Sequence, residues 1–151
     1  MKITILGCGN MGTAYARSFR KYGLVKPEDL RLVIRGEGRR AQLETLGHVI
    51  DNGISDSDLV IIAVKPQDFG AIAPTLAPVI TKDQVVLSIM AGITLQRLKD
   101  SLKHTMVVRA MPNAPAQIGM GITAYATGTE LNMRQTLMVE QLLNCTGRAM
   151  H

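Results

Sequence analysis

A glycine-rich turn close to the start of the chain constrains its fold more than any other feature. An apolar run, ITIL at 3–6, leads directly into GCGNMG at 7–12, and a helical pattern extends over 10–22. Glycine costs chain entropy and contributes no side chain, so a plain core segment has no use for three of them here. A strand, a G-x-G-x-x-G turn and a helix in this order are typical of the turn that holds a dinucleotide diphosphate.

Each glycine of this turn has its own expected role. Gly7 permits the tight turn, Gly9 lets the backbone approach the phosphates, and Gly12 lets the helix pack closely on the strand. The helix N-terminus presents unpaired N–H groups and a partial positive charge to the same place. A glycine-rich turn without a ligand is the alternative. The expected cofactor-binding residues here are Gly7, Cys8, Gly9, Asn10, Met11 and Gly12.

The residue that ends the second strand predicts which dinucleotide is bound. In NAD-binding proteins an acidic residue there holds the ribose 2′-hydroxyl, but this strand ends LVIRGEGRR, with Arg35 in that position. A guanidinium binds a phosphate through two parallel hydrogen bonds, whereas a carboxylate repels it. We therefore expect NADPH rather than NADH. NADH stays open because Glu37 is able to turn back toward the ribose.

The rest of the chain repeats the alternation of strand and helix. Strand-like runs and helical patterns at this spacing predict βαβ units, hence a doubly wound, Rossmann-type α/β fold with a mainly parallel sheet and helices on both faces. The length of 151 residues fits a single domain, 1–151. The expected strands are 3–6, 30–34, 48–50, 59–64, 85–90, 106–111 and about 122–126, and the expected helices are 10–22, 37–46, 67–79, 94–103 and 130–144.

Composition excludes several other classes of protein. The longest apolar run, LVIIAV at 59–64, is too short to span a bilayer, and a strand that starts at Ile3 leaves no room for a signal peptide. We therefore expect a cytoplasmic protein without a membrane partner. Two cysteines and three scattered histidines offer no metal spacing. The net charge is +5, but the basic residues are dispersed and aromatics are only 3%, which does not favour nucleic-acid binding.

Three further loops follow strands whose carboxyl ends should meet at the ligand-binding edge of the sheet. AVKPQD at 63–68 follows the fourth strand, and Pro66 forces Lys65 into an extended conformation. SIMAGIT at 88–94 follows the fifth, with small residues that leave room for a flat ring. RAMPNAPA at 109–116 follows the sixth, where the Asn113 carboxamide is able to donate and accept hydrogen bonds. Each loop alone has an ordinary explanation as a turn, but three at consecutive strand ends indicate a site.

Taken together, GxGxMG, AVKPQ, AGIT and MPNxPA resemble the pyrroline-5-carboxylate reductases, and the resemblance covers essentially the whole chain. It implies an amino-terminal NADPH-binding domain and the reduction of 1-pyrroline-5-carboxylate, a small-molecule substrate, to L-proline. It also implies a helical second domain that forms homo-oligomers and completes the substrate site, and that domain would begin where this sequence stops. The fragment alone would then have little activity.

The resemblance also implies positions for the cofactor. The 2′-phosphate would lie near Arg35, and Asn52 would reach toward the adenosine. No catalytic residue or metal ligand is identified, because the groups that hold the substrate and donate a proton would lie in the other half. On the nicotinamide side the resemblance places Ala63, Val64, Lys65, Pro66, Ile89, Met90 and Ala91, with Pro112 and Asn113 beside nicotinamide and substrate.

Two alternatives remain open from the sequence. In the first, the chain is part of a neighbouring NADP-dependent dehydrogenase that acts on a hydroxy acid or on another imine. In the second, it is a non-enzymatic NADP-binding module. The final segment, CTGRAMH, reads as a helix cap at Gly147 followed by the first residues of another strand.

Overall fold

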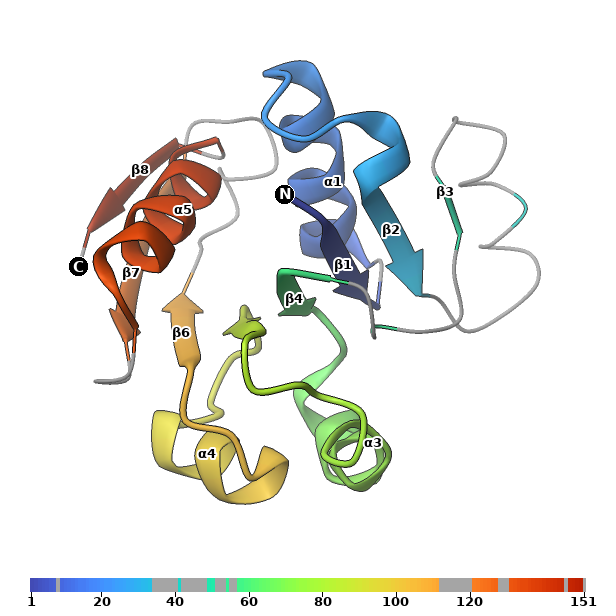
Figure 1. Ribbon diagram of the computed structural model, residues 1–151, viewed down its shortest axis with the longest axis vertical. Coiled ribbons are helices and arrows are strands. Elements are labelled where there is room, and N and C mark those ends of the chain that lie inside the picture. Colours follow the sequence, from blue (N-terminus) through green and yellow to red (C-terminus); the bar gives the residue numbers. More distant parts are fainter. Residues whose placement is uncertain are drawn as a thin grey trace.

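The structure is a computed structural model, and it describes residues 1–7, 9–33, 41, 49–50, 54, 57–111, 121–127, 131–145 and 147–150. Within these residues the fold is built around one eight-stranded sheet (Figure 1). The strands are β1 (Ile3–Leu6), β2 (Leu30–Val33), β3 (Val49–Ile50), β4 (Leu59–Ile62), β5 (Val85–Ser88), β6 (Val107–Met111), β7 (Gly121–Thr127) and β8 (Gly147–Met150).

The order of the strands is that of a doubly wound sheet. Across the sheet they lie as β3-β2-β1-β4-β5-β6-β7-β8. The first six are parallel to one another, β7 is antiparallel to β6, and β8 is parallel to β7. The chain leaves β1 in one direction for β2 and returns on its other side as β4, so the order reverses at β1. The Rossmann-type, mainly parallel fold that the sequence predicts is confirmed.

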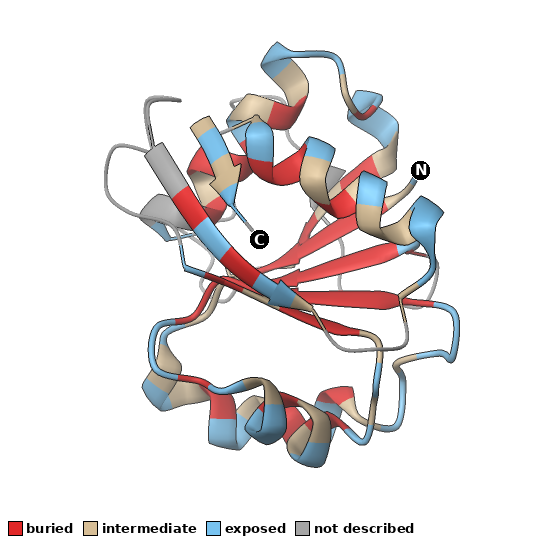
Figure 2. Cartoon of the chain, turned by 90° about the vertical axis from the view of Figure 1, so that its left-hand side faces the viewer, coloured by how far each residue is buried: buried red, intermediate tan, exposed pale blue. Residues whose placement is uncertain are grey.

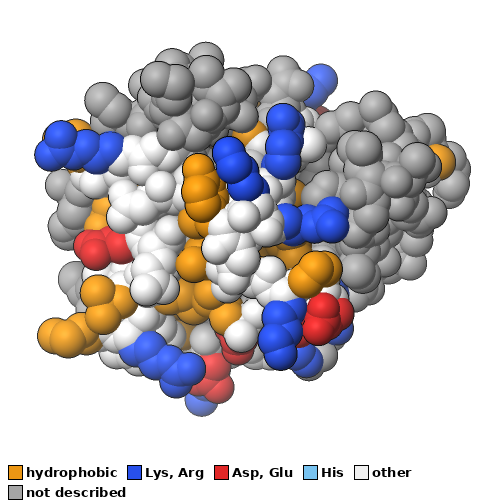
Figure 3. Space-filling view, turned by 90° about the horizontal axis from the view of Figure 1, so that it is seen from above, with side chains coloured by type: hydrophobic (Ala, Val, Ile, Leu, Met, Phe, Trp, Pro, Cys, Tyr) orange, Lys and Arg blue, Asp and Glu red, His pale blue; other side chains and the backbone are white. Residues whose placement is uncertain are grey.

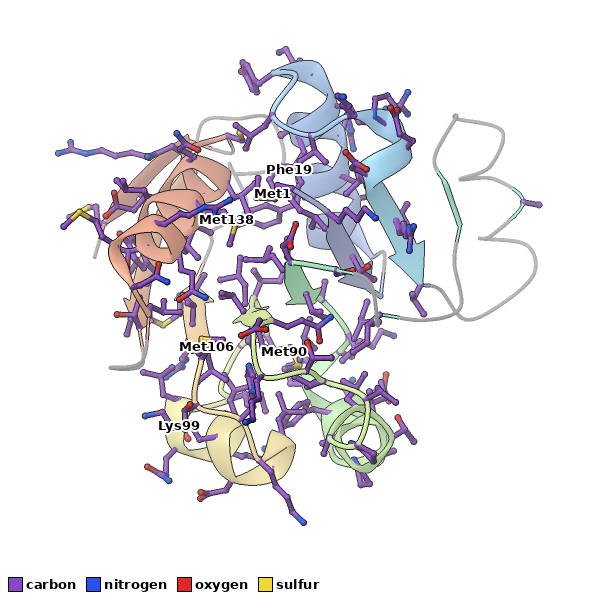
Figure 4. All side chains as sticks on the ribbon, viewed as in Figure 1. Met1, Phe19, Met90, Lys99, Met106 and Met138 are labelled. Carbon is purple, nitrogen blue, oxygen red and sulfur yellow. The ribbon has the colours of Figure 1, made fainter. Side chains whose placement is uncertain are left out.

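Helices cover both faces of this sheet. Figure 2 shows α1 and α5 above the sheet and α3 and α4 below it. Phe19 of α1 and Met138 of α5 lie on the upper side and Met90 on the lower (Figure 4). The helices are α1 (Asn10–Lys21), α3 (Phe69–Leu76), α4 (Leu95–Leu102) and α5 (Met133–Asn144), with 3-10 helices at Pro27–Asp29 and Pro66–Asp68.

Coverage on both sides explains why the central strands are apolar throughout. All four residues of β1, β4 and β5 are buried. Ile3 and Ile5 belong to the cluster under α1 and α5, whereas Leu6 belongs to the cluster with α3 and α4. The buried Thr4 hydroxyl is hydrogen-bonded to that of Ser57, which satisfies the polar group within the core.

Most of the predicted strands and helices within the described residues are of the right type but too long, whereas β7 extends one residue beyond each end of the expected 122–126. β4 ends at Ile62 and β5 at Ser88, two residues before the apolar runs end, because the next residues already belong to the loops. The segment 67–79 is a 3-10 turn followed by α3, and of the predicted helix 37–46 only residue 41 lies within the described residues. The strand expected at the end of the chain is present as β8, but the helix cap expected at Gly147 is wrong, because α5 ends at Asn144 with Cys145 as its C-cap and Gly147 is already the first residue of β8.

Side-chain caps define where two of the helices start. The Thr94 hydroxyl accepts a hydrogen bond from the Arg97 N–H, 3.1 Å away, which makes Thr94 the N-cap of α4. At α5 the Asn132 side chain accepts from the Gln135 N–H at 2.8 Å, and the Gln135 side chain accepts from the Asn132 N–H at 3.0 Å. This reciprocal capping box starts the helix two or three residues later than expected.

The amino-terminal edge of the sheet is closed by internal hydrogen bonds. The buried Gln84 side chain donates to the carbonyls of Ile54 and Ser57, at 2.7 and 2.9 Å, and accepts from the Thr81 N–H at 2.9 Å. The Lys2 N–H donates to the Asp58 carboxylate at 2.7 Å. These polar groups form hydrogen bonds with one another, so this edge of the sheet has a structural role.

Beneath α5, Tyr125 of β7 donates a hydrogen bond to Glu140, with 2.6 Å between the oxygens. Burial first, and then this hydrogen bond and the negative charge of Glu140, raise the pKa of Tyr125 from 10.0 to about 12. We expect Tyr125→Phe to lower the free energy of unfolding by about 1–2 kcal/mol at pH 8, because Glu140 loses its donor. Urea denaturation measures this loss.

The pH dependence of the same pair has a defined sign. The raised pKa stabilises the folded chain below pH 10, and this contribution disappears as the pH rises to about 12. The difference in free energy of unfolding between the unsubstituted chain and Tyr125→Phe should therefore decrease between pH 10 and about pH 12. Tyr22→Phe is the matched control, since Tyr22 is 58% exposed. It should change the free energy of unfolding by no more than about 0.5 kcal/mol. An unchanged difference at pH 12 would show that Tyr125 does not carry the effect.

Candidate functional site

The carboxyl-terminal edge of the sheet is the candidate site, because parallel strands there end side by side. The strand register places Val33, Leu6, Ile62, Ser88 and Arg109 in one row across β2, β1, β4, β5 and β6. The loops that follow these strands therefore start at the same level. The reversal of strand order at β1 puts the turn after β1 at the centre of this edge, where open α/β sheets bind their ligands.

Gly7 makes the sharp turn that leads out of β1. Its φ is +81°, and its N–H donates to the Val33 carbonyl at 2.9 Å. A Cβ atom at this position would lie 2.8 Å from the Val64 side chain and 3.0 Å from the Ala63 carbonyl oxygen. Both the left-handed backbone and the close approach of the next loop therefore require glycine.

Gly12 brings the helix α1 against this turn. A Cβ atom there would lie 2.5 Å from the Gly7 carbonyl oxygen and 3.1 Å from the Ala63 Cβ. Real Cβ atoms do not approach backbone oxygens so closely, so any larger residue would push α1 away from the sheet. The third glycine is thus the one that packs helix on strand, as the spacing of the motif predicts.

Gly9 differs from both of these glycines, because a Cβ atom built on it would meet no atom of the described residues within 4 Å. Its φ of −75° is ordinary, so neither strain nor packing explains the glycine. Gly9 is the N-cap of α1, where it has no side chain to bind the first N–H groups, and the first turn contains no acidic residue. Bare backbone, open space and the positive end of a helix meet here, which suits an anionic group.

The loop after β4 lies against the glycine turn. The Ala63 N–H donates to the Leu6 carbonyl at 2.8 Å, so the loop continues the β1–β4 pairing. Lys65 is extended, with ψ of 139°, as expected for a residue before proline, and Pro66 opens the 3-10 helix. The Lys65 side chain is exposed. This loop thus borders the Gly7 turn, while its lysine is solvated.

The loop after β5 divides into a buried and an exposed part. The Ile89 N–H donates to the Ile62 carbonyl at 3.1 Å, and the Met90 N–H donates to the Ser88 hydroxyl at 3.2 Å. Met90 is 2% exposed and packs with α3 and α4, so its side chain belongs to the core. Ala91 is the exposed residue of the segment predicted for the nicotinamide.

Five predicted site residues lie outside the described part of the chain, and their roles stay predictions. They are Cys8, Arg35, Asn52, Pro112 and Asn113.

Two polar residues at this edge were not anticipated from the sequence. Ser88 is fully buried, and its hydroxyl holds the start of the β5 loop. Arg109 interrupts the apolar run of β6, and its buried Nε has no hydrogen-bond partner among the described residues. The sequence signal that could have identified both positions is a polar residue inside an otherwise apolar strand.

Two negative findings apply to the described residues alone. They contain no group of three or more His, Cys, Asp or Glu side chains placed to hold a metal ion. No helix among them has the length and apolar character needed to cross a membrane. Basic side chains lie scattered among apolar ones on the face seen from above (Figure 3).

Comparisons with known proteins agree with this geometry. Residues 2–92 match the family described as NADP oxidoreductase, coenzyme F420-dependent. Pyrroline-5-carboxylate reductase from Pseudomonas aeruginosa is 31% identical over 155 residues, which is 99% of this chain and 56% of that protein. The chain therefore spans about half the length of the curated relatives it matches.

Solved structures give the same result for the fold. A pyrroline-5-carboxylate reductase from Coxiella burnetii superposes with a TM-score of 0.91 at 24% identity, over 99% of this chain and 57% of that one. The pyrroline carboxylate reductase of Plasmodium falciparum, solved with NADP bound, superposes with a TM-score of 0.87 at 21% identity, over 99% and 56%. At these identities the likeness concerns the fold.

Proposed function

Because the chain belongs to the family described as NADP oxidoreductase, coenzyme F420-dependent, we propose that it binds NADPH as the cofactor-binding part of a pyrroline-5-carboxylate reductase. The observation that carries this proposal is the glycine turn. Gly7 and Gly12 have steric reasons within the protein, but the open backbone at Gly9 has none. A diphosphate on the N-terminus of α1 supplies the missing reason.

The residues of the turn fit the proposed cofactor in charge as well as in shape. No acidic side chain stands in the first turn of α1 to repel the phosphates. Ala63 and Ala91 provide small side chains in the loops that follow the neighbouring strands β4 and β5, where the nicotinamide end is expected. This chain thus contributes by binding and orienting the cofactor. Positioning alone accounts for a large part of the rate acceleration of a hydride transfer between two bound partners.

When bound, NADPH supplies a hydride from C4 of its nicotinamide to the C=N carbon of 1-pyrroline-5-carboxylate, and the product is L-proline. The ring nitrogen gains a proton in the same reaction. We assign no described residue to that proton transfer, because the exposed Lys65 is the only ionisable side chain in the two described loops at 63–66 and 89–92.

Selectivity for NADPH is proposed to come from Arg35. Arg35→Asp should weaken NADPH binding about 30-fold or more and NADH binding no more than about threefold, because a carboxylate repels the 2′-phosphate. Titration of nicotinamide fluorescence with each nucleotide measures both constants. Arg17→Asp, an exposed arginine on α1, is the control for net charge. Equal losses for the two nucleotides would mean that Arg35 does not bind the 2′-phosphate.

The chain is proposed to need the other half of its relatives for turnover. It covers only 56% of the P. aeruginosa relative, and the groups that hold the substrate and the homo-oligomer contacts are assigned to the remainder. We expect the 151-residue chain to bind NADPH and to oxidise it at less than about 1% of the rate of a whole enzyme with 1-pyrroline-5-carboxylate. Absorbance at the NADPH band follows the reaction. Robust proline formation by this chain would contradict the assignment.

The same assay separates the alternatives. The chain joined to the unmatched segment of the P. aeruginosa relative should reduce 1-pyrroline-5-carboxylate and not a panel of small keto acids. Preference for a keto acid would favour a hydroxy-acid dehydrogenase. NADPH binding without any turnover by the joined protein would favour a non-enzymatic NADP-binding module.

A further inference from the structure

The outer side of α3 differs from the outer sides of the other described helices, because it carries no charge. Phe69, Ala73 and Leu76 are buried in the cluster on the lower face of the sheet, whereas Ala71 and Thr75 are exposed. The chain has no Asp, Glu, Lys, Arg or His over 69–81. On the other described helices the exposed positions include charged side chains, namely Arg17 and Lys21 on α1, Arg97 and Asp100 on α4, and Arg134 on α5.

An uncharged outer side is unusual for a helix that faces water. A helix at the surface of a domain normally has charged or polar residues on its outside, and a helix that is apolar all round is normally buried. Val79, just after α3, is 48% exposed, and a Cβ atom built on Gly70 would meet no atom of the described residues within 4 Å. We call this surface the α3 face, and its residues are Asp68, Gly70, Ala71, Pro74, Thr75, Pro78, Val79 and Lys82.

The α3 face is arranged symmetrically about Thr75. Ala71 precedes Thr75 by four residues, and Val79 follows it by four. Asp68 precedes Thr75 by seven residues, and the exposed Lys82 follows it by seven. Positions three or four residues apart share one side of a helix. A two-fold axis through Thr75 would therefore place Ala71 against Val79, and Asp68 against Lys82, of a second copy.

Each end of the α3 face carries one charge of either sign. Lys65 and Asp68 lie at its start, and Lys82 and Asp83 lie at its end. An antiparallel pairing of two copies brings carboxylates against ammonium groups, whereas a parallel pairing brings like charges together. The net charge of +5 opposes self-association through the basic surfaces of the chain. An uncharged face with complementary ends is therefore the surface on which two copies approach with the least repulsion.

We propose that the α3 face is a contact surface for a second copy of this chain, in an antiparallel two-fold pair of α3 helices. A strongly charged partner is a poor occupant, because the face has no charge over 69–81 to select it. The eight residues of α3 span only about 12 Å, so the contact is smaller than a standard interface of ~1,600 Å². We expect a dissociation constant on the order of 100 µM.

This inference goes beyond the proposed function, because it concerns association of the chain rather than the cofactor. The buried residues of α1 belong to the cluster on one face of the sheet, and those of α3 belong to the cluster on the other (Figure 2). Joining two copies through α3 thus does not cover the N-terminus of α1. The contact is also separate from the homo-oligomer contacts assigned to the other half of the relatives.

Sedimentation equilibrium of the 151-residue chain without NADPH tests the proposal. Between about 10 and 500 µM the average mass should rise from the 16.4 kDa of the monomer toward twice that value. Thr75→Lys should raise the dissociation constant at least about tenfold, because the two-fold axis brings the new ammonium groups together. Thr136→Lys on α5 is the matched control and should leave the constant unchanged. Both hydroxyls donate to a carbonyl of the preceding turn, Thr75 to Ile72 at 2.6 Å and Thr136 to Asn132 at 3.0 Å.

Two charge reversals test the antiparallel orientation. Asp68→Lys and Lys82→Asp should each raise the dissociation constant about tenfold, because like charges then meet at both ends of the pair. An equimolar mixture of the two variants should associate about as strongly as the unsubstituted chain, because each lysine then faces an aspartate. Each substitution changes the net charge of +5 by only two, so both chains stay positive and overall attraction between them does not account for the recovery.

Three results would overturn the proposal. They are a chain that stays monomeric at about 500 µM, equal effects of Thr75→Lys and Thr136→Lys, and a mixture that associates no more than its components. Slower hydroxyl-radical labelling of Val79 in a monomeric chain joined to the unmatched segment of the P. aeruginosa relative would overturn it too, and would assign the face to that segment. None of these readouts requires NADPH or turnover, so failure here is distinct from failure of the proposed function.

Discussion

Replacing Gly9 with serine is expected to weaken NADPH binding at least tenfold while the chain remains as stable as before. The Cβ and hydroxyl of the new residue would enter the open space where the phosphates are proposed to lie. Serine is also a better N-cap than glycine, so its hydroxyl would accept from the N–H groups that the phosphates need. The affinity for NADPH should therefore fall, whereas the free energy of unfolding should rise or stay unchanged.

Two measurements decide this prediction. Titration of nicotinamide fluorescence gives the NADPH dissociation constant, and urea denaturation gives the free energy of unfolding. Gly70→Ala is the control, because Gly70 is an exposed residue of α3 and a Cβ atom added to it would meet nothing within 4 Å. It should leave NADPH binding unchanged. If Gly9→Ser binds NADPH as the unsubstituted chain does, the diphosphate does not rest on this turn.

Replacing Gly12 with alanine is expected to lower the free energy of unfolding strongly, because the added methyl group has no room between α1 and the glycine turn. The Cβ would lie 2.5 Å from the Gly7 carbonyl oxygen, which is backbone and has no rotamer to change. The free energy of unfolding should fall by about 3 kcal/mol, since the cost of forcing α1 off the sheet exceeds the gain of about 1 kcal/mol in helix propensity. NADPH binding should fall with it, because the turn moves.

Urea denaturation of Gly12→Ala beside Gly70→Ala isolates the steric effect. Both changes add one methyl group to a helical glycine, but only Gly12 has a backbone atom in the way. Gly70→Ala should be slightly more stable than the unsubstituted chain. A Gly12→Ala chain of unchanged stability would mean that the helix and the turn are not in such close contact.

Much of this site was accessible from residue order. The spacing of the three glycines predicts a tight turn at the first and a close contact at the third, and the positive φ of Gly7 and the packing of Gly12 confirm both. Pro66 predicts an extended Lys65, and Thr94 predicts a helix start, as observed. These features are local, because each depends on sterics or hydrogen bonds within a few residues.

Other features were beyond the reach of local rules. Met90 lies in a loop that the family resemblance places on the nicotinamide side, but its side chain packs in the cluster with α3 and α4. Which side a loop residue faces depends on the register of β5 against β4 and β6, and the sequence does not encode that register locally. The buried Nε of Arg109 is another example, because the neighbours that surround it come from other strands.

By itself the sequence determined the alternation of strands and helices, the doubly wound class and the place of the glycine turn. Backbone sterics and hydrophobic periodicity act between near neighbours, so they can be read along the chain. Tertiary structure alone decided which glycine faces open space, which side chains leave the site for the core, and that no described helix covers one face of β7 and β8. Those outcomes depend on strands far apart in sequence that the sheet brings side by side, and burial is a property of that assembly rather than of any single segment.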